Sequence, residues 1–321
     1  MEKPMSSPMP RIVVLTPVFN EEDNLSRFEA DVRETLLDRT DADYSVIFID
    51  DGSADRSWEM IEDICRRDTR FKGIRLSRNF GSHIALAAGF NYAEGDAVAV
   101  LACDLQDPPG TILQFVEHWR AGNQIVWGHR RSRDETIWRS LSSSVFQAMI
   151  RRFAMPRGSS FTTGSFLLAD RKVVEYYRQF REHNRITFAL VAWTGFRQAT
   201  VEYDRLGRQA GRSGWNFSKM IKAMYDTFVG FSPLPIQIIT TAGAGTSLFS
   251  LLLGAYLLTN WLFGNPAQGW TSIMLAISSF FAVQFMLLGI MSQYLYRIYT
   301  EVVRRPLYFV SEVVNVGVEA P

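Results

Sequence analysis

The most informative absence in this sequence is charge: from Thr227 to Tyr296 there is no Asp, Glu, Lys or Arg. Charged residues make up 21% of the whole chain. At that rate, about 15 charges would be expected over the stretch. The net charge of +1 gives no general bias toward nucleic acid or acidic partners. The uncharged stretch therefore indicates a segment that folds against a nonpolar solvent.

Other absences exclude whole classes of protein. The sequence has no glycine-rich phosphate loop of either common type, which argues against kinases, ATPases and simple dehydrogenases. It has no metal-type spacing of Cys and His, and its only cysteines, Cys65 and Cys103, sit in apolar segments. We predict that both are reduced core thiols in a reducing compartment. Residues 1–10 lack the apolar run of a signal peptide and are predicted to be a flexible tail.

Two uncharged runs, 236–263 and 270–296, are each longer than the ~20 residues that a helix needs to cross a bilayer core. A turn-forming segment from Gly264 to Gly269 separates them. We therefore predict a pair of transmembrane helices within residues 234–296, in preference to a buried hairpin in a soluble protein. Basic residues flank the pair, whereas the short connecting loop has none. This predicts that both termini are cytoplasmic, and the flanking residues are Lys219, Lys222, Arg297, Arg304 and Arg305.

The segment just before the first span, residues 215–233, has apolar residues at helical spacing. They are Phe217, Ile221, Met224, Phe228 and Phe231. This pattern predicts an amphipathic helix at the membrane surface, and packing of the same helix on the N-terminal domain remains an alternative. Residues 297–321 are predicted to form a cytoplasmic tail.

Residues 11–214 alternate between β-branched runs and helical stripes. The expected strands are 11–16, 44–49, 71–76, 97–103 and 124–128. Helical spacing lies between them, for example at Leu25, Phe28 and Val32, and again over residues 83–93 and 111–120. This alternation predicts a mostly parallel sheet with helices on both faces, which binds ligands at the carboxyl ends of its strands.

Polar motifs follow several of these strands. Asp50 and Asp51, before a tight turn, suit a ribose or a base N–H because carboxylates accept hydrogen bonds; an ordinary Asx turn is the alternative. Arg78 follows the third strand and can hold a phosphate. Asp104 follows the fourth strand, where a divalent cation can bridge it to a diphosphate. Capping of the helix that starts near Pro108 is the alternative there.

Taken in order, these motifs resemble those of family 2 glycosyltransferases with the GT-A fold. More narrowly, they are similar to polyprenyl-phosphate glycosyltransferases, the group that includes dolichyl-phosphate mannose synthases and bacterial bactoprenol glucosyl transferases. The resemblance extends over roughly residues 10–310. It rests on segments 17–21, 50–53, 78–81 and 104–109, and further on 163–166, 170–172 and 208–215.

The resemblance implies a Rossmann-like GT-A catalytic domain over residues 11–214, attached to the C-terminal transmembrane hairpin. It implies an inverting enzyme that moves a sugar from a nucleotide sugar, most simply a UDP-sugar, to a polyprenyl phosphate such as undecaprenyl phosphate. The reaction would take place at the cytoplasmic face of the plasma membrane. By the same resemblance, a homo-oligomer, specifically a tetramer, is expected, and nucleic acid is not a partner.

The resemblance also implies roles for individual residues. Pro17, Phe19, Glu21 and Asp51 would hold the base and ribose, and Asp50, Arg78 and Cys103 complete the predicted donor-binding set. Asp104 would bind Mg²⁺ or Mn²⁺ together with the donor diphosphate. Arg205 and Arg208 would bind phosphate, from either the donor or the lipid, and are counted with Asp104 as catalytic.

The sequence departs from the family pattern at three positions. Ala102 stands where the family usually has a carboxylate, two residues before Asp104. Metal binding must then depend on Asp104, with Gln106 or Asp107. Ser165 and Gly214 replace a frequent Asp and Lys.

Two other functions remain open from the sequence. A processive polysaccharide synthase normally has more spans and a Gln-x-x-Arg-Trp motif; here Ser213 follows Arg212. A non-catalytic membrane scaffold or flippase subunit is the second alternative, because Ala102 weakens the metal motif.

Overall fold

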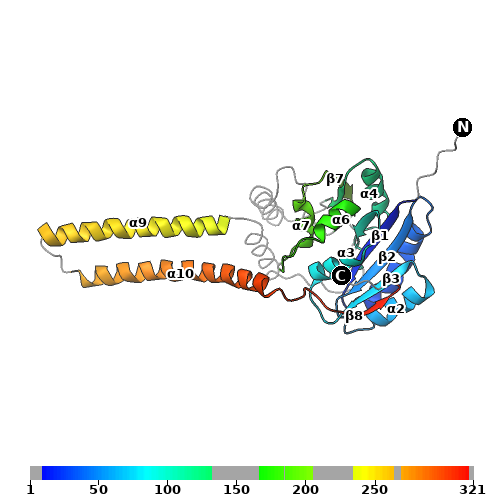
Figure 1. Cartoon of the computed structure of the whole chain (residues 1–321), viewed down its shortest axis with the longest axis horizontal. Helices are drawn as coiled ribbons and strands as arrows, with labels where there is room; N and C mark the ends of the chain where they lie inside the picture. The colour runs from blue at the N-terminus through cyan, green and yellow to red at the C-terminus, as the bar shows by residue number, and fades with distance from the viewer. Residues whose placement is uncertain (1–8, 132–165, 184, 205–233, 264–268, 318–321) are drawn as a thin grey trace. The chain divides into compact units, whose positions relative to one another are not determined.

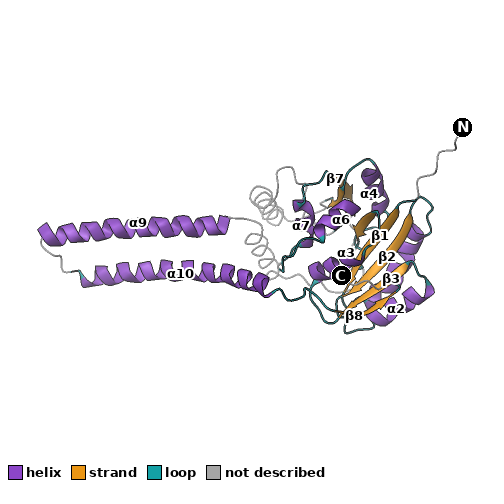
Figure 2. Ribbon diagram, in the orientation of Figure 1, coloured by secondary structure: helices purple, strands orange, loops and turns teal. Residues whose placement is uncertain are grey.

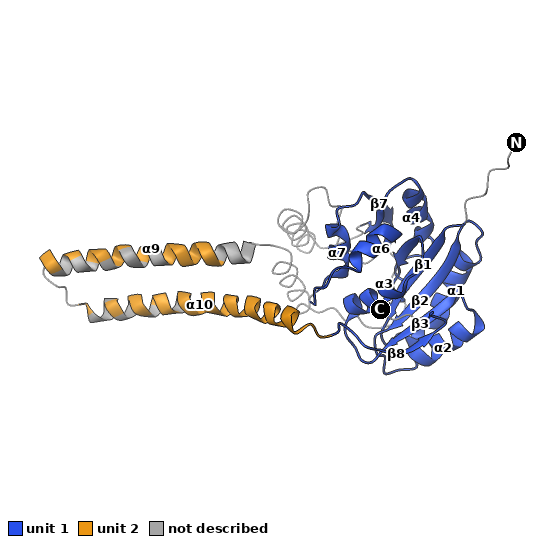
Figure 3. Ribbon diagram, in the orientation of Figure 1, with its two compact units in different colours: residues 1–220, 306–321 blue, residues 221–305 orange. Residues whose placement is uncertain are grey.

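A computed structural model describes residues 9–131, 166–183, 185–204, 234–263 and 269–317 (Figure 1). The chain divides into two compact units (Figure 3). We call Met1–Met220 with Pro306–Pro321 the sheet unit, and Ile221–Arg305 the helical unit. Arg205, Arg208, the predicted surface helix over 215–233, Ser165 and Gly214 lie outside the described residues.

An eight-stranded sheet forms the centre of the sheet unit, in the order β7-β5-β6-β4-β1-β2-β3-β8. Strands β1 and β2, β1 and β4, β2 and β3, and β5 and β7 pair in parallel, whereas β6 and β8 pair antiparallel to their neighbours. The prediction of a mostly parallel sheet is confirmed. The strands are β1 Arg11–Val18, β2 Asp43–Asp50, β3 Phe71–Leu76, β4 Ala97–Val100, β5 Ile125–Arg130, β6 Leu167–Asp170, β7 Gln198–Tyr203 and β8 Val310–Val314.

Helices cover both faces of this sheet (Figure 2). On one face, α1, α2 and α4 contribute Phe28, Ile61 and Phe115 to a core that also holds Phe48 of β2. On the other face, Gly89 of α3 packs directly against Leu15 and Ile49 of the sheet. The helices are α1 Glu22–Val32 with the π-helical turn η1 Arg33–Leu37, α2 Ser57–Arg67, α3 Ser82–Tyr92, α4 Thr111–Arg120, α6 Arg171–Tyr177 and α7 Thr187–Trp193.

The central strands β4, β1, β2 and β3 run in the same direction, so their carboxyl ends share one edge of the sheet. Four loops emerge there: 19–21 after β1, 51–56 after β2, 77–81 after β3 and 101–110 after β4. All the predicted donor-binding and metal-binding residues of the described chain lie in these loops or at the strand ends that lead into them.

The C-terminal segment was predicted to be a tail, but residues 310–314 form the edge strand β8. It pairs antiparallel with β3, placing Val313 opposite Ile74 and Glu312 opposite Arg75. The strand is short and its side chains are mostly exposed, so it has little of the period-two apolar pattern that identifies a strand in sequence.

The helical unit contains two long helices, α9 Leu234–Phe263 and α10 Trp270–Val303. They pack antiparallel: Gly243 faces Leu287, and the rings of Phe249 and Phe280 are 6.0 Å apart. Helix α10 extends beyond the predicted end at Tyr296. Among the described residues, one segment, Ser279–Val303, is long and apolar enough to cross a membrane, with a mean hydropathy of 1.2 and no buried residues. The two-span topology stays a prediction.

Candidate active site

The loops after β1 and β2 are fastened to each other. The Asn20 backbone N–H donates to Ser53 Oγ at 2.9 Å, and its side-chain Oδ1 accepts from the Ala54 N–H at 2.9 Å. Asn20 has a φ of +53°, a left-handed conformation that asparagine tolerates better than most residues. One step along, the Glu21 N–H donates to Ser57 Oγ at 2.9 Å. These bonds fix the β1 loop that carries Phe19 and Glu21.

Asp51 fastens the third loop, after β3, to the same edge. Its Oδ1 accepts from the Phe80 N–H at 2.7 Å, and its Oδ2 accepts from the Gly81 N–H at 2.8 Å. Burial raises the pKa of Asp51, and these two backbone hydrogen bonds oppose the rise. Asp51 is only 3% exposed. In this arrangement both carboxylate oxygens hold the start of α3, beside Arg78.

Gly52 permits the close approach of these two loops. It has a φ of +68°, and a Cβ added there would lie 2.5 Å from the carbonyl carbon of Arg78. A side chain at this position would therefore be strained and would collide with backbone rather than with a movable side chain. The glycine of the Asp-Asp-Gly-Ser motif is required by packing as well as by its turn.

Arg78 presents an exposed cation at this edge. Its guanidinium carbon lies 4.0 Å from the centroid of the Phe80 ring, and its Nη1 donates to the Asn79 carbonyl oxygen at 3.2 Å. Stacking on an aromatic ring restricts the side chain without neutralising its charge. A guanidinium held this way is suited to an anionic ligand such as a phosphate.

The loop after β4 carries Asp104. This residue is partly exposed, and its Oδ1 accepts from the Gln106 N–H at 3.3 Å. Leu105 adopts a φ of +55°, an unusual conformation for a bulky residue. Such outliers gather at functional sites when the surrounding structure enforces them. Asp107 points inward, is 3% exposed and accepts from the Tyr203 hydroxyl at 2.6 Å.

Exposure separates the predicted site residues into two groups. A ligand at this edge can reach the exposed or partly exposed side chains: Pro17, Phe19, Glu21, Arg78 and Asp104. The other group is buried: Asp50, Asp51, Cys103, Gln106 and Asp107. Burial, with the nearby carboxylates of Glu21 and Asp104, raises the pKa of Cys103 well above its usual value, so this thiol is neutral. The assigned roles stay predictions.

The structure adds residues that the sequence did not single out. Asn20 and Ser53 occur in the quoted motifs, but nothing in their spacing predicted that they bond to each other. Tyr203 is 96 residues from Asp107, and no sequence pattern links the two. Pairing between residues this far apart becomes visible once the strands are assembled.

The side chains at the β4 loop fit one mode of metal binding. Within the described residues, no three Cys, His, Asp or Glu side chains gather as a metal site. Mg²⁺ commonly binds through one or two carboxylates and completes its shell with water and substrate phosphates. Asp104, partly exposed at the ligand edge, suits that mode. Asp107 is buried and already holds the Tyr203 hydroxyl, so Asp104 is the better candidate of the two.

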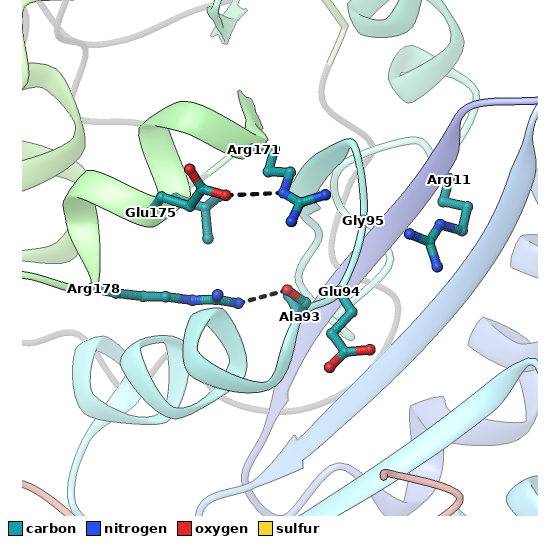
Figure 4. Close-up of a pocket in the computed structure, with 8 residues that line it drawn as sticks. Arg11, Ala93, Glu94, Gly95, Arg171, Glu175 and Arg178 are labelled. Atoms are coloured by element: carbon teal, nitrogen blue, oxygen red, sulfur yellow. Dashed lines mark hydrogen bonds and ion pairs between the residues drawn. The ribbon is translucent and has the colours of Figure 1, made fainter. Parts of the chain in front are cut away.

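A pocket at the opposite edge of the sheet is separate from this site (Figure 4). It lies beside Arg11, where β1 begins, and Gly95, just before β4. Two further arginines line it, and both have partners: Arg171 pairs with Glu175 at 2.9 Å, and Arg178 donates to the Ala93 carbonyl oxygen at 2.6 Å. Arg178 therefore caps the end of α3. None of the predicted site residues lines the pocket.

These observations define an α/β protein with a mostly parallel sheet and its ligand edge at the strands' carboxyl ends. The chain belongs to the glycosyl transferase family 2, whose model matches residues 13–178. It is therefore a glycosyltransferase, as the motifs predicted, which argues against the non-catalytic alternative.

Relatives match nearly the whole chain. A bactoprenol glucosyl transferase of Shigella flexneri, derived from prophage SfII, is 33% identical over 305 residues, covering 94% of this chain and 98% of the relative. An undecaprenyl-phosphate 4-deoxy-4-formamido-L-arabinose transferase of Proteus mirabilis is 32% identical over 320 residues, covering 95% and 94%.

A solved structure shares the fold. It is a mannosyltransferase of Pyrobaculum calidifontis in complex with GDP-Man and Mn²⁺. The two structures align with a TM-score of 0.51 and 16% sequence identity, covering 91% of this chain and 88% of the other. The likeness supports the predicted GT-A fold.

Proposed function

We propose that the protein transfers a sugar from a nucleotide sugar to a polyprenyl phosphate at the cytoplasmic face of the membrane. One observation supports this most strongly: relatives named for bactoprenol and undecaprenyl phosphate match almost end to end, across both the sheet unit and the helical unit. The two relatives are named for different sugars, so the lipid acceptor is the common element. We propose a UDP-sugar as the donor.

The proposed nucleophile does not need a strong general base. A phosphate monoester has a second pKa near 6 and is largely dianionic at pH 7. One of its oxygens attacks the anomeric carbon, a new C–O bond forms, and the bond from that carbon to the donor diphosphate breaks. The nucleoside diphosphate leaves, and attack from the opposite face inverts the anomeric centre. The demanding step is therefore stabilisation of the departing diphosphate.

Residues at the ligand edge are suited to that step. Asp104 would hold a divalent cation, Mg²⁺ or Mn²⁺, which supplies Lewis-acid stabilisation of the leaving diphosphate. Arg78, stacked on Phe80, would contribute a fixed positive charge. Phe19, which is 45% exposed, would stack on the base beside Glu21. Arg205 and Arg208 would bind phosphate, as the family pattern implies.

The helical unit supports the proposed acceptor. Its large apolar side chains are widely exposed along both helices, among them Leu252 of α9 and Phe285 of α10. Exposed apolar surface of this extent marks a membrane or protein interface. We propose that α9 and α10 both span the bilayer, with the positively charged ends of the pair in the cytoplasm. A polyprenyl phosphate keeps its chain in the same bilayer and its headgroup at the surface.

The test is a donor panel. Membranes that contain the full-length protein are incubated with undecaprenyl phosphate, MnCl₂ and radiolabelled UDP- or GDP-sugars, and the lipid phase is counted. We expect label from one UDP-sugar to enter the lipid phase. Label only from a GDP-sugar would correct the base, and label in a long polymer would favour a processive synthase. No transfer to lipid from any donor in the panel would reject the proposal.

A further inference from the structure

The C-terminal strand β8 is fastened to the sheet beside the candidate site. At its start, the Ser77 N–H donates to the Phe309 carbonyl oxygen at 2.9 Å, immediately before Arg78. The Tyr308 hydroxyl accepts from Asn91 Nδ2 of α3 at 2.8 Å. At its other end, Asn315 Nδ2 donates to the Phe71 carbonyl oxygen at 3.0 Å. The strand is thus held along its whole length against β3.

One side chain of β8 reaches toward the site through a chain of contacts. Glu312 Oε1 pairs with Arg75 Nη1 at 2.8 Å, and its Oε2 accepts from Trp58 Nε1 at 3.2 Å. The Arg75 guanidinium lies over the Trp58 ring, 5.6 Å from its centroid. These contacts hold Arg75 from the edge of the sheet that β8 forms.

Arg75 in turn faces a buried carboxylate. Its Nε lies 3.5 Å from Asp50 Oδ2, and Asp50 has no exposed surface. A buried carboxylate that loses its neighbouring cation is strongly destabilised. Asp50 accepts from the Ser53 N–H at 3.2 Å, and Ser53 Oγ accepts from the Asn20 N–H. The contacts therefore run from Glu312 through Arg75 and Asp50 to the β1 and β2 loops.

We propose that Glu312 is a positioning residue for the nucleotide-sugar site. By holding Arg75 against Asp50, it keeps in place the β1 and β2 loops, which the bond between Asn20 and Ser53 joins. The role in donor binding rests on the proposed function, whereas the effect on the loops does not. In this role Glu312 acts through Arg75 and the loops. It makes the C-terminal strand, which follows directly on the helical unit in the chain, part of the site's framework.

The first test measures the loops directly. Hydrogen exchange of the full-length protein in detergent micelles is followed for peptides covering 18–24 and 50–57 in wild type and Glu312→Gln. We expect several-fold faster exchange in the variant. The matched control is Ser311→Ala, which removes a β8 hydrogen bond to the Arg75 carbonyl oxygen and leaves the ion pairs intact. Unchanged exchange in Glu312→Gln, or equal acceleration in both variants, would overturn the proposal.

The second test uses the donor identified by the panel. Glu312→Gln should raise the donor KM by about two- to fivefold, the range expected for losing a partly exposed ion pair, while kcat changes little. Glu312→Asp should recover part of the loss. In an Arg75→Gln background, Glu312→Gln should have no further effect, because the two residues act through one path. Additive effects or a fall in kcat alone would count against positioning. Faster exchange in a protein that transfers no sugar would reject the proposed function and leave the loop role standing.

Discussion

The sheet unit and the helical unit keep their apolar side chains in opposite places. Phe28, Phe48 and Phe115 of the sheet unit are 0% exposed, whereas Leu252, Phe285 and Met286 of the helical unit are 63%, 66% and 65% exposed. Burial of apolar surface stabilises a fold in water, but the exposed surface is stable against lipid or another nonpolar partner. This contrast supports the proposal that the two units meet different solvents.

Polar groups differ between the units in the same way. Asp50 and Asp51 are buried in the sheet unit, where they accept hydrogen bonds from the backbone of neighbouring loops. In the helical unit, the hydroxyls of Thr246, Thr259 and Ser292 donate to carbonyl oxygens of their own helix. That pattern satisfies a polar group locally, as a nonpolar surrounding requires. Buried carboxylates of the sheet unit thus join loops, whereas these three hydroxyls of the helical unit bond within one helix.

The largest expected effect is on sugar transfer by the sheet unit, with membrane attachment through the helical unit unchanged. Asp104→Asn should lower transfer by about a hundredfold or more, because a neutral amide holds a divalent cation and its diphosphate poorly. Membrane attachment should not change. The measurement is lipid-phase label per unit of protein in washed membranes. The control is Asp43→Asn, an exposed aspartate at the start of β2, on the opposite edge of the sheet. Near-normal transfer by Asp104→Asn would remove this residue from the mechanism.

A second substitution tests whether the site depends on close loop packing. Gly52→Ala places a Cβ against the Arg78 backbone and should cost about 3 kcal/mol or more. Gly122→Ala is the matched control, since Gly122 also has a positive φ, +93°, but nothing lies within 4 Å of its Cβ position. It should cost only about 1 kcal/mol. Thermal unfolding in detergent micelles compares the two, and equal losses would show that backbone strain alone explains the Gly52 effect.

Much of this fold follows from sequence periodicity. The helices predicted around Leu25–Val32, over 83–93 and over 111–120 occur, as do the five predicted strands. Most of these segments have an apolar stripe or a β-branched run, and α3 is apolar on nearly every side. The site's edge was predictable for the same reason: a polar motif after a strand must lie at that strand's end. Strand β8 was not, because Val310–Val314 is short, exposed and paired with residues far away in the chain.

The hydrogen bonds that the buried aspartates of the site make were also not predictable from the sequence. The adjacent Asp50 and Asp51 predicted two ligand-binding carboxylates, and these roles stay predictions; the hydrogen bonds that both make to neighbouring loops were not predicted. Sequence gives the residue type and its approximate location, whereas the direction of a side chain depends on how neighbouring loops fold over it. Asp107 illustrates the same point: its partner Tyr203 lies on β7, a strand that the sequence motifs did not predict.

A third prediction tests the solvent of the helical unit. Phe285→Arg, near the middle of α10, should weaken membrane insertion by about 3 kcal/mol if that surface faces hydrocarbon. Val302→Arg, near the end of the helix, is the control, because a long basic side chain there can reach the interface. The fraction of protein that resists carbonate extraction gives the readout. If both variants stay in the membrane like wild type, the exposed face of α10 contacts protein rather than lipid.

The smallest expected effect concerns surface charge in the sheet unit. Asp68 accepts hydrogen bonds from the side chain and backbone N–H of Arg70 and from Arg33, and these hold its pKa well below the usual aspartate value. A lowered folded-state pKa contributes stability that is present above pH ~4 and is lost as the pH falls toward the folded value. Asp68→Asn should therefore reduce the free energy of unfolding by about 1 kcal/mol at pH 7. The difference from wild type should shrink between pH 5 and pH 2. Thermal unfolding followed by circular dichroism gives the readout, and Asp63→Asn, at a more exposed ion pair on α2, is the control. A difference that stayed constant with pH would mean that the loss comes from contacts that the amide cannot make, and that the charge of Asp68 adds nothing to the stability of the sheet unit.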